Sequence, residues 1–137
     1  MKISAVRLHI LEDPGSYGRF NKIVRVPELR RIQYTHKGVR EGAARQAFIE
    51  VETDTGLVGR CTTSMGPSQV EILRRHALGE DPLAREHLYQ LFHKGTRWVY
   101  QNPGWFGDFD NCLWEIAGKA AGMPVTALVG RVRDALP

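Results

Sequence analysis

The chain has 137 residues, with 19 lysines and arginines against 15 aspartates and glutamates and a net charge of +4. Its 42% hydrophobic and 25% charged residues are typical of a globular protein, which excludes disordered, collagen-like and disulfide-scaffold proteins. The length suits one domain and excludes a complete (β/α)8 barrel, which needs about 250 residues.

The N-terminal half predicts a small antiparallel sheet of two or three strands. Residues 2–11 alternate apolar and polar side chains, as a half-buried strand does, and residues 12–18 contain the proline and glycines of a turn. Residues 47–61 predict a hairpin, because two alternating runs flank a short turn that contains glycine. Between these elements, residues 19–45 predict a mobile basic loop with a short strand around 23–26.

The C-terminal half is predicted to be helical. The clearest helix runs from Phe109 to Ala121, with apolar residues on one face and Asp108 as its N-cap. Residues 96–107, rich in aromatic residues, proline and glycine, predict a loop that packs against the helices. Strands followed by helices indicate an α+β fold. The predicted helices span about 67–78, 82–94, 109–121 and 124–129.

Motif searches yield no complete catalytic set. The five histidines lack the spacing of a zinc site, and residues 15–18 lack the lysine and hydroxyl residue of a phosphate-binding loop. No G-x-S-x-G elbow occurs. Cys61 and Cys112 lie 51 positions apart, and without an export signal we expect reduced thiols rather than a disulfide, with Cys112 packed in the core.

The sequence indicates neither a membrane span nor export. No run of about 18 apolar residues occurs, so we expect no membrane-spanning helix. Charged side chains interrupt residues 1–7, where a signal peptide is apolar. The expected location is the cytoplasm.

Positive charge is concentrated in residues 19–45, the basic segment. It contains eight lysines and arginines but only two acidic residues, so it attracts anions. Tyr17, Phe20 and Tyr34 lie beside or among these cations and could stack on nucleic-acid bases. A solvated loop explains the same composition, and we expect that reading rather than nucleic-acid binding.

Two segments carry a family resemblance. The hairpin EVETDTGLVG (residues 50–59) and the helix DNCLWEIAGKAAGMP (residues 110–124) resemble, in order and spacing, the N-terminal domain of the mandelate racemase/muconate lactonizing enzyme family in the enolase superfamily. Cys112 and Glu115 stand where the family commonly has alanine and aspartate, and neither change should disturb the helix. Gly118 has no side chain and lets this helix approach a neighbour closely.

The resemblance implies a cap without its barrel. In this family a three-stranded antiparallel meander and a bundle of three to four helices form an N-terminal capping domain, here residues 1–137 with strands at about 2–61 and helices at about 67–130. The resemblance places the catalytic residues and Mg²⁺ in a C-terminal barrel domain that abstracts a proton alpha to a carboxylate. This chain ends at Pro137, about where the first barrel strand would begin, so we expect no catalytic residue, metal or cofactor in it and no activity without a barrel.

Caps of this family close two loops over the barrel mouth, where they exclude water and contact the substrate. The resemblance places one loop around Tyr17, Arg19 and Phe20 and the other around Ser64 and Met65. Because a basic loop suits a carboxylate, the expected parent is a Mg²⁺-dependent acid-sugar dehydratase. Two alternatives stay open: a racemase or cycloisomerase parent of the same family, and a non-catalytic module that binds polyanions through the basic segment.

The expected partners follow from the same resemblance. They are a barrel domain in the same or a separate chain, a carboxylate-bearing small molecule, and further copies of the chain in a homo-oligomer. Neither nucleic acid nor a membrane is expected to be a partner.

Overall fold

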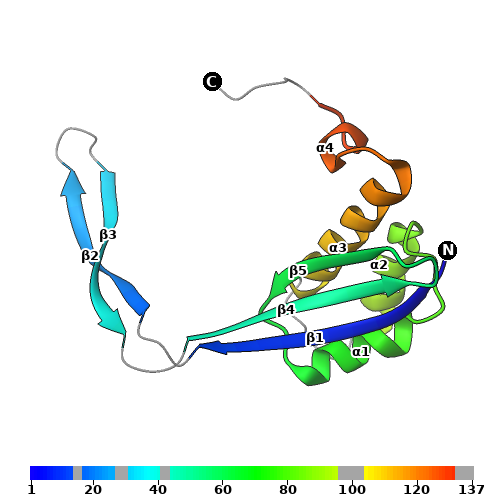
Figure 1. The fold of residues 1–137 in the computed structure, drawn as a ribbon, viewed down its shortest axis with the longest axis horizontal. Coiled ribbons are helices and arrows are strands. Elements are labelled where there is room, and N and C mark those ends of the chain that lie inside the picture. Colours follow the sequence, from blue (N-terminus) through cyan, green and yellow to red (C-terminus); the bar gives the residue numbers. More distant parts are fainter. Residues whose placement is uncertain (14–16, 27–30, 41–43, 96–103, 132–137) are drawn as a thin grey trace. The chain divides into compact units, whose positions relative to one another are not determined.

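A computed structural model describes most of the chain (Figure 1). The contacts divide it into two units, one formed by Met1–Ile10 and Ala47–Pro137 and the other by Leu11–Gln46. The structure describes the backbone of residues 1–13, 17–26, 31–40, 44–95 and 104–131, and the side chains of residues 1–11, 46–94 and 106–131.

The first unit is built on a three-stranded antiparallel sheet, as predicted. Its strands are β1 (Ile3–Asp13), β4 (Ala44–Thr53) and β5 (Val58–Thr63), in the order β1-β4-β5 (Figure 1). β4 and β5 pair antiparallel through the predicted hairpin. β1 also runs against β4, because the Lys2 N–H donates to Asp54 and the Ser4 hydroxyl donates to the Glu52 carbonyl.

The second unit is a two-stranded antiparallel sheet of β2 (Tyr17–Val26) and β3 (Arg31–Arg40). The prediction of a mobile loop is therefore wrong for these residues, and the short strand expected around 23–26 is part of β2. The register places Ile23 opposite Tyr34 and Arg25 opposite Ile32. β-Branched and aromatic residues favour strands, but their preference depends on cross-strand partners that a linear reading of the basic segment does not pair.

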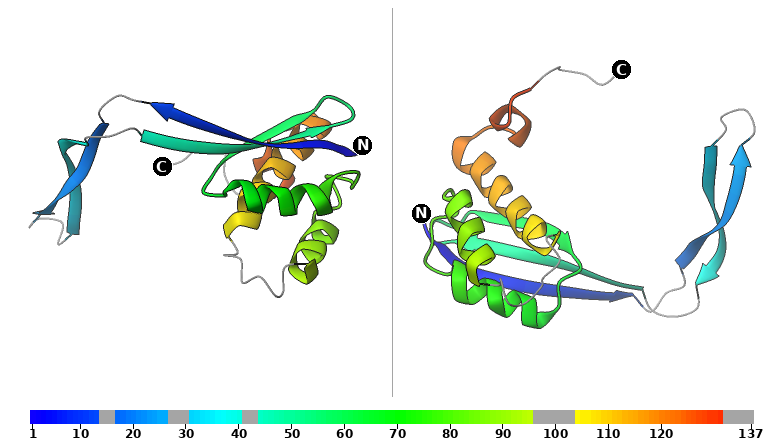
Figure 2. Two further views of the ribbon diagram at one scale, coloured as in Figure 1. Left: turned by 90° about the horizontal axis from the view of Figure 1, so that it is seen from below. Right: turned by 180° about the vertical axis from the view of Figure 1, so that it is seen from behind.

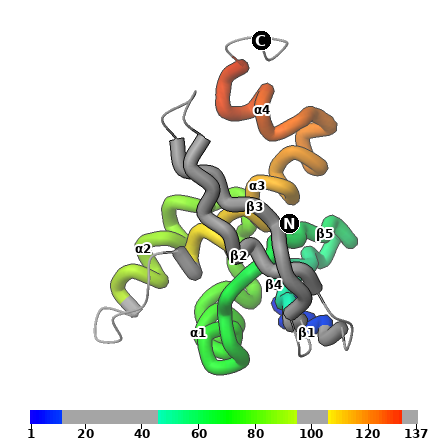
Figure 3. Tube along the Cα trace, turned by 90° about the vertical axis from the view of Figure 1, so that its left-hand side faces the viewer, coloured from blue at the N-terminus to red at the C-terminus, as the bar shows by residue number. Residues whose placement is uncertain are grey.

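Among the described residues, four helices follow the sheet, and Figures 2 and 3 show α1 and α2 on the same side of β4 and β5. They are α1 (Pro67–Ala77), α2 (Arg85–Gly95), α3 (Gly104–Ala121) and α4 (Val125–Leu128). α1 ends as predicted before Gly79, whose φ of 83° is accessible mainly to glycine. In the part of the chain that the structure describes, no helix is both long and apolar enough to cross a membrane.

The start of α3 differs from the prediction. The helix begins at Gly104, so residues 104–107 of the expected aromatic loop are helical, while residues 96–103 lie outside the described residues. Asp108 is inside the helix rather than at its N-cap and accepts a hydrogen bond from Thr63 Oγ1 at 2.7 Å. Phe106 packs on Phe92 with ring centroids 5.7 Å apart, and this burial favours the extra helical turn although Gly104 and Gly107 are poor helix formers.

The start of α2 also differs from the prediction. Pro82 was expected to open this helix, but it lies buried in the preceding turn, and the helix begins at Arg85. The Ala84 N–H donates to the Asp81 carbonyl at 3.0 Å, which closes this turn. Proline suits both a turn and the first turn of a helix, so the sequence alone does not separate the two.

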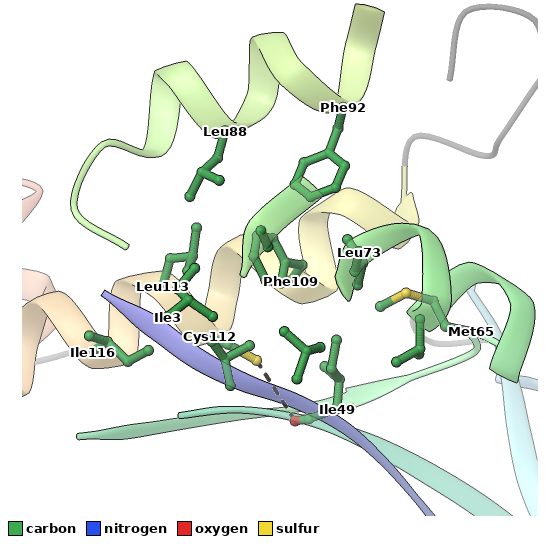
Figure 4. Packing of buried hydrophobic residues seen from close by; sticks show 14 residues of the cluster. Ile3, Ile49, Met65, Leu73, Leu88, Phe92, Phe109, Cys112, Leu113 and Ile116 are labelled. Atoms are coloured by element: carbon green, nitrogen blue, oxygen red, sulfur yellow. Dashed lines mark hydrogen bonds between the residues drawn. The ribbon is translucent and has the colours of Figure 1, made fainter. Parts of the chain in front are cut away.

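The hydrophobic core lies between the sheet and the helices (Figure 4). Cys112 is fully buried there, as predicted, and its Sγ donates to the Ile49 carbonyl at 3.8 Å. Burial raises the pKa of this thiol far above its ordinary value, so it is chemically inert. Cys61 and Cys112 are both free thiols. The core residues are Ile3, Val6, Ile49, Val51, Met65, Val70, Leu73, Ala77, Leu88, Phe92, Phe109, Cys112, Leu113 and Ile116.

Two glycines allow close backbone approach in this core. A Cβ added at Gly59 of β5 would collide with the Cys112 carbonyl group of α3, whose carbon would lie 2.8 Å away. A Cβ at Gly118 would lie 3.0 Å from the Met123 carbonyl oxygen and 3.3 Å from Val125 Cγ2. The close approach predicted for Gly118 is thus confirmed, and the neighbour is the turn that leads into α4.

The other face of the sheet carries a network of ion pairs. Glu50 accepts from Arg7 Nη1 at 3.1 Å and from Arg60 Nε at 2.7 Å, and Arg7 also reaches Glu52 at 2.6 Å. His9 stacks on Phe48 beside this network, with ring centroids 4.5 Å apart. This face is therefore polar, in keeping with contact with water.

Glu50 should make stability depend on pH. Burial raises the pKa of this carboxyl, but hydrogen bonds from Arg60 and Arg7 lower it more, so its pKa lies below the ordinary value. The unfolded state then binds more protons near pH 4, and the stabilisation is complete above the unfolded pKa of about 4.3 and is lost as pH falls through the folded value. Urea unfolding between pH 7 and pH 3 should show a steeper loss of free energy for the wild type than for Glu50→Gln. Parallel curves would contradict this assignment.

Candidate functional site

The loop between β5 and α1 is held rigidly and presents one polar side chain. Thr63 Oγ1 donates to Asp108 and accepts from the Met65 N–H at 3.0 Å. The Gly66 N–H donates to Gln69 Oε1 at 2.7 Å, which caps α1. Ser64 stands exposed at the centre of these contacts. These contacts anchor the residues on both sides of Ser64, whose hydroxyl is accessible to a ligand.

The structure separates the two residues that the sequence placed in this loop. Ser64 is exposed, whereas Met65 is only 3% exposed and packs in the hydrophobic core. The sequence carries no signal for this difference, because neither residue belongs to a periodic element. Contact of either residue with a substrate stays a prediction.

The other predicted loop, around Tyr17, Arg19 and Phe20, forms the first part of β2. The pairing with β3 shifts register between Gly18 and Phe20 and again between Phe20 and Lys22, and such bulges are common beside active sites. β2 and β3 together contain six lysines and arginines and no acidic residue. The side chains of both strands lie outside the described residues, so their contact with a substrate also stays a prediction.

Arg85 forms a cluster that the sequence reasoning missed. Its guanidinium binds Asp110 through two hydrogen bonds, from Nε at 2.8 Å and from Nη2 at 2.5 Å. Its Cζ lies 3.6 Å from the centre of the Trp114 ring. Asp110 and Trp114 are four residues apart on α3 and share a helix face, and this spacing is the signal that could have indicated a common partner. The cluster joins the start of α2 to α3.

Two surface hollows flank this cluster. One, the alanine groove, has a volume of about 490 Å³ and is formed by the turn before α2, the C-terminal half of α3, and α4. The other has a volume of about 340 Å³ and contains more charge. The alanine groove is lined by Leu83, Arg85, Trp114, Ala117, Ala120, Ala121 and Leu128. The second hollow is lined by Arg85, Glu86, Tyr89, Phe106 and Asp110.

Glu115 ties α3 to the edge strand β5. It accepts from the Arg60 N–H at 2.7 Å and from Lys119 Nζ at 2.6 Å, and Lys119 also donates to the Val58 carbonyl at 2.5 Å. Burial raises the pKa of Glu115, but Lys119 and the Arg60 N–H lower it more, so this carboxylate is held ionised. α3 runs unbroken through Cys112 and Glu115, as expected for these two substitutions.

We find no metal centre among the residues that the structure describes. No group of three or more histidine, cysteine or carboxylate side chains lies close enough together to hold an ion. The polar groups of this part of the chain include the Ser64 loop, the Arg85 cluster, the Glu115 link and the ion pairs of the sheet and of α1.

Curated relatives that resemble the chain in sequence include two D-galactonate dehydratases. The D-galactonate dehydratase of Verminephrobacter eiseniae is 32% identical over 101 residues, which are 66% of this chain and 26% of that protein. The D-galactonate dehydratase of Xanthomonas campestris pv. campestris (strain B100) is 30% identical over 115 residues, 75% of this chain and 29% of that protein. The chain thus spans about a quarter of the length of the relatives that it matches.

Solved structures share the fold. D-glucarate dehydratase from Agrobacterium tumefaciens, complexed with magnesium, superposes with a TM-score of 0.75 at 23% identity, over 98% of this chain and 34% of that one. The sequence model described as mandelate racemase/muconate lactonizing enzyme, N-terminal domain, matches residues 22–130. Because this match includes β4, β5 and all four helices, the chain belongs to the mandelate racemase/muconate lactonizing enzyme family.

Proposed function

We propose that the chain is the capping domain of an acid-sugar dehydratase of the enolase superfamily. Relatives at 30% and 32% identity are named D-galactonate dehydratase, and this observation carries the proposal. Because the chain spans about a quarter of their length, residues 1–137 would supply the cap, and a C-terminal barrel domain would supply the catalytic residues and bind Mg²⁺. Location in the cytoplasm and assembly with further copies belong to the same proposal.

Dehydration of an acid sugar begins when a base removes the proton alpha to the carboxylate. The electron pair moves onto the carboxylate, and the enediolate must be stabilised electrostatically before hydroxide leaves from the β-carbon. Water must be kept out while this anion exists. A cap contributes to this step by closing over the substrate, not by moving a proton.

Two parts of this chain suit such a role. The Ser64 loop is anchored to α1 and α3, so it can offer a hydroxyl to a polyol with little loss of conformational entropy on binding. Met65, buried beneath it, would contact the substrate only if the loop opened. Arg19 is the residue that we assign to the carboxylate or to a distal anionic group, with Tyr17 and Phe20 beside it.

Other members of the family would need a similar cap. A racemase or cycloisomerase parent stays an alternative, because these reactions also begin with proton removal alpha to a carboxylate. The names of both relatives favour dehydration. Binding of a polyanion through the basic segment is the non-catalytic alternative.

The proposal is tested by joining this chain to the part of the Xanthomonas campestris relative that follows its matched region, a protein we call the fused enzyme. With Mg²⁺ and D-galactonate, we expect dehydration by the fused enzyme and none by the 137-residue chain. Arg19→Ala should raise the KM of the fused enzyme about tenfold or more, because a charge-assisted hydrogen bond contributes about 1.5–3 kcal/mol.

The matched control is Arg75→Ala on α1. This side chain is 74% exposed and pairs with Glu71 on the same helix. The substitution should therefore leave the KM of the fused enzyme within twofold of the wild-type value. Dehydration by the chain alone would contradict the division of labour between cap and barrel. An unchanged KM for Arg19→Ala would remove Arg19 from the substrate site.

A further inference from the structure

We propose that the alanine groove is the surface on which the C-terminal domain of the longer protein docks. The inference rests on the proposed function, because it takes that domain as the partner. The alanine groove would then be the face of the cap that contacts this domain, and the contact would be apolar.

The groove is apolar where a solvated surface would carry charge. Three alanines of α3 line it, and Leu83, which also lines it, is 50% exposed. Met123 and Val129, in the segments that flank α4 at the same end, are 45% and 59% exposed. Soluble monomers seldom leave large apolar patches in water, so an apolar groove with exposed apolar residues in the adjoining segments favours a contact surface.

The charged side chains near the groove, Arg85 and Lys119, already bind partners within this chain. Among the described residues that line the groove, Arg85 alone is charged, and it is bound by both oxygens of Asp110 and by the face of Trp114. Lys119 of the same helix turns away from the groove to the Val58 carbonyl and Glu115. An anionic ligand would find no free cation among these residues, whereas aliphatic or aromatic side chains of a protein partner would fit.

Two other described surfaces of this unit differ in character. The open face of the sheet carries the ion-pair network of Arg7, Glu50 and Arg60. The exposed side of α1 carries Glu71 with its two arginine partners. The charged groups of both surfaces are hydrated. A partner that covered them would remove this water, and the desolvation of the ion pairs would cost binding free energy. The end of α3 and α4 lie beyond the edge strand β5 (Figure 1), where a further domain can reach them without displacing the sheet or α1.

The length of the relatives supports a domain as the occupant. The matched relatives have about three quarters of their length outside the region that this chain covers. A cavity of about 490 Å³ holds a few apolar side chains, which is a suitable anchor at the centre of a domain interface.

The test places a charge in the groove of the fused enzyme. Ala120 is exposed in this chain, so Ala120→Glu should leave the melting temperature of the 137-residue chain within about 4 °C of the wild type. In the fused enzyme the same change should split one cooperative calorimetric transition into two and lower kcat/KM for D-galactonate at least tenfold. Leu83→Asp repeats the test at a lining residue in the turn before α2. The matched control is Ser68→Glu, at an exposed residue in the first turn of α1. It should leave the single calorimetric transition intact and kcat/KM within twofold of the wild type.

The outcomes separate this inference from the proposed function. If the fused enzyme is active and both groove variants behave like Ser68→Glu, the docking surface lies elsewhere and the inference is overturned, while the proposed function stands. If the fused enzyme is inactive on D-galactonate but its single transition is split by Ala120→Glu, the proposed activity fails and the docking surface is supported.

Discussion

Replacement of Gly59 by alanine should destabilise the fold by about 3 kcal/mol or more. The added Cβ would lie 2.8 Å from the carbonyl carbon of Cys112, which is backbone and cannot rotate away as a side chain can. Either α3 moves off β5 or the strand bends, and both changes open the core around Cys112 and Ile49. Because domains of this size are stable by only about 5–15 kcal/mol, urea unfolding should detect the loss readily.

Gly107→Ala is the matched control for this prediction. A Cβ at Gly107 meets nothing within 4 Å, and the residue is exposed in α3. The same substitution should therefore stabilise the chain by about 0.5–1 kcal/mol, since alanine is the better helix former. Equal effects of the two substitutions would show that β5 and α3 do not approach as closely as described.

Loss of the Arg85 guanidinium should cost about 2 kcal/mol of folding free energy. Arg85→Ala removes two charge-assisted hydrogen bonds to Asp110 and the stacking on Trp114, and it leaves a partly buried carboxylate without its partner. Arg85→Lys keeps the charge but loses the planar fork, so it should restore less than half of the loss. A double-mutant cycle with Asp110→Ala should give a coupling energy of about 1.5 kcal/mol.

A pair on α1 gives the comparison for this cycle. Arg75 and Glu71 stand four residues apart, with Nε and Oε1 at 3.5 Å, and are 74% and 50% exposed. Their coupling energy should not exceed about 0.5 kcal/mol, because water screens the charges and the side chains lose entropy on pairing. A coupling for Arg85 and Asp110 as small as this would mean that the cluster does not hold α2 against α3.

Sequence patterns predicted the elements that depend on local periodicity. The β4–β5 hairpin and helix α1 follow from short-range alternation, from helical spacing and from the prolines and glycines that end them. Strand β3 was missed because its apolar alternation is confined to Ile32 and Tyr34 within a segment rich in cations, and pairing with β2 shows it to be a strand. The first turn of α3 was missed because glycines suggested a loop, whereas packing of Phe106 decides the structure.

The candidate site divides in the same way. Arg19, Tyr17, Phe20, Ser64 and Met65 were assigned from a family resemblance, and the structure describes the side chains of only the last two. It separates them, with Ser64 in solvent and Met65 in the core. The Arg85 cluster was not predicted, since Arg85 and Asp110 lie 25 positions apart and nothing local links a cation to a carboxylate at that distance.

The sequence by itself determined the fold class and the family, because both depend on residue order and spacing. Only the tertiary structure decided which polar groups pair and which apolar ones stay exposed. Whether Ala120 faces the core or a groove depends on where α3 packs, and that position is fixed by the contact of Gly59 with Cys112 and by the link from Arg85 to Asp110. Contacts between distant segments exist only after folding, so the docking surface and its chemistry could be inferred only from the folded chain.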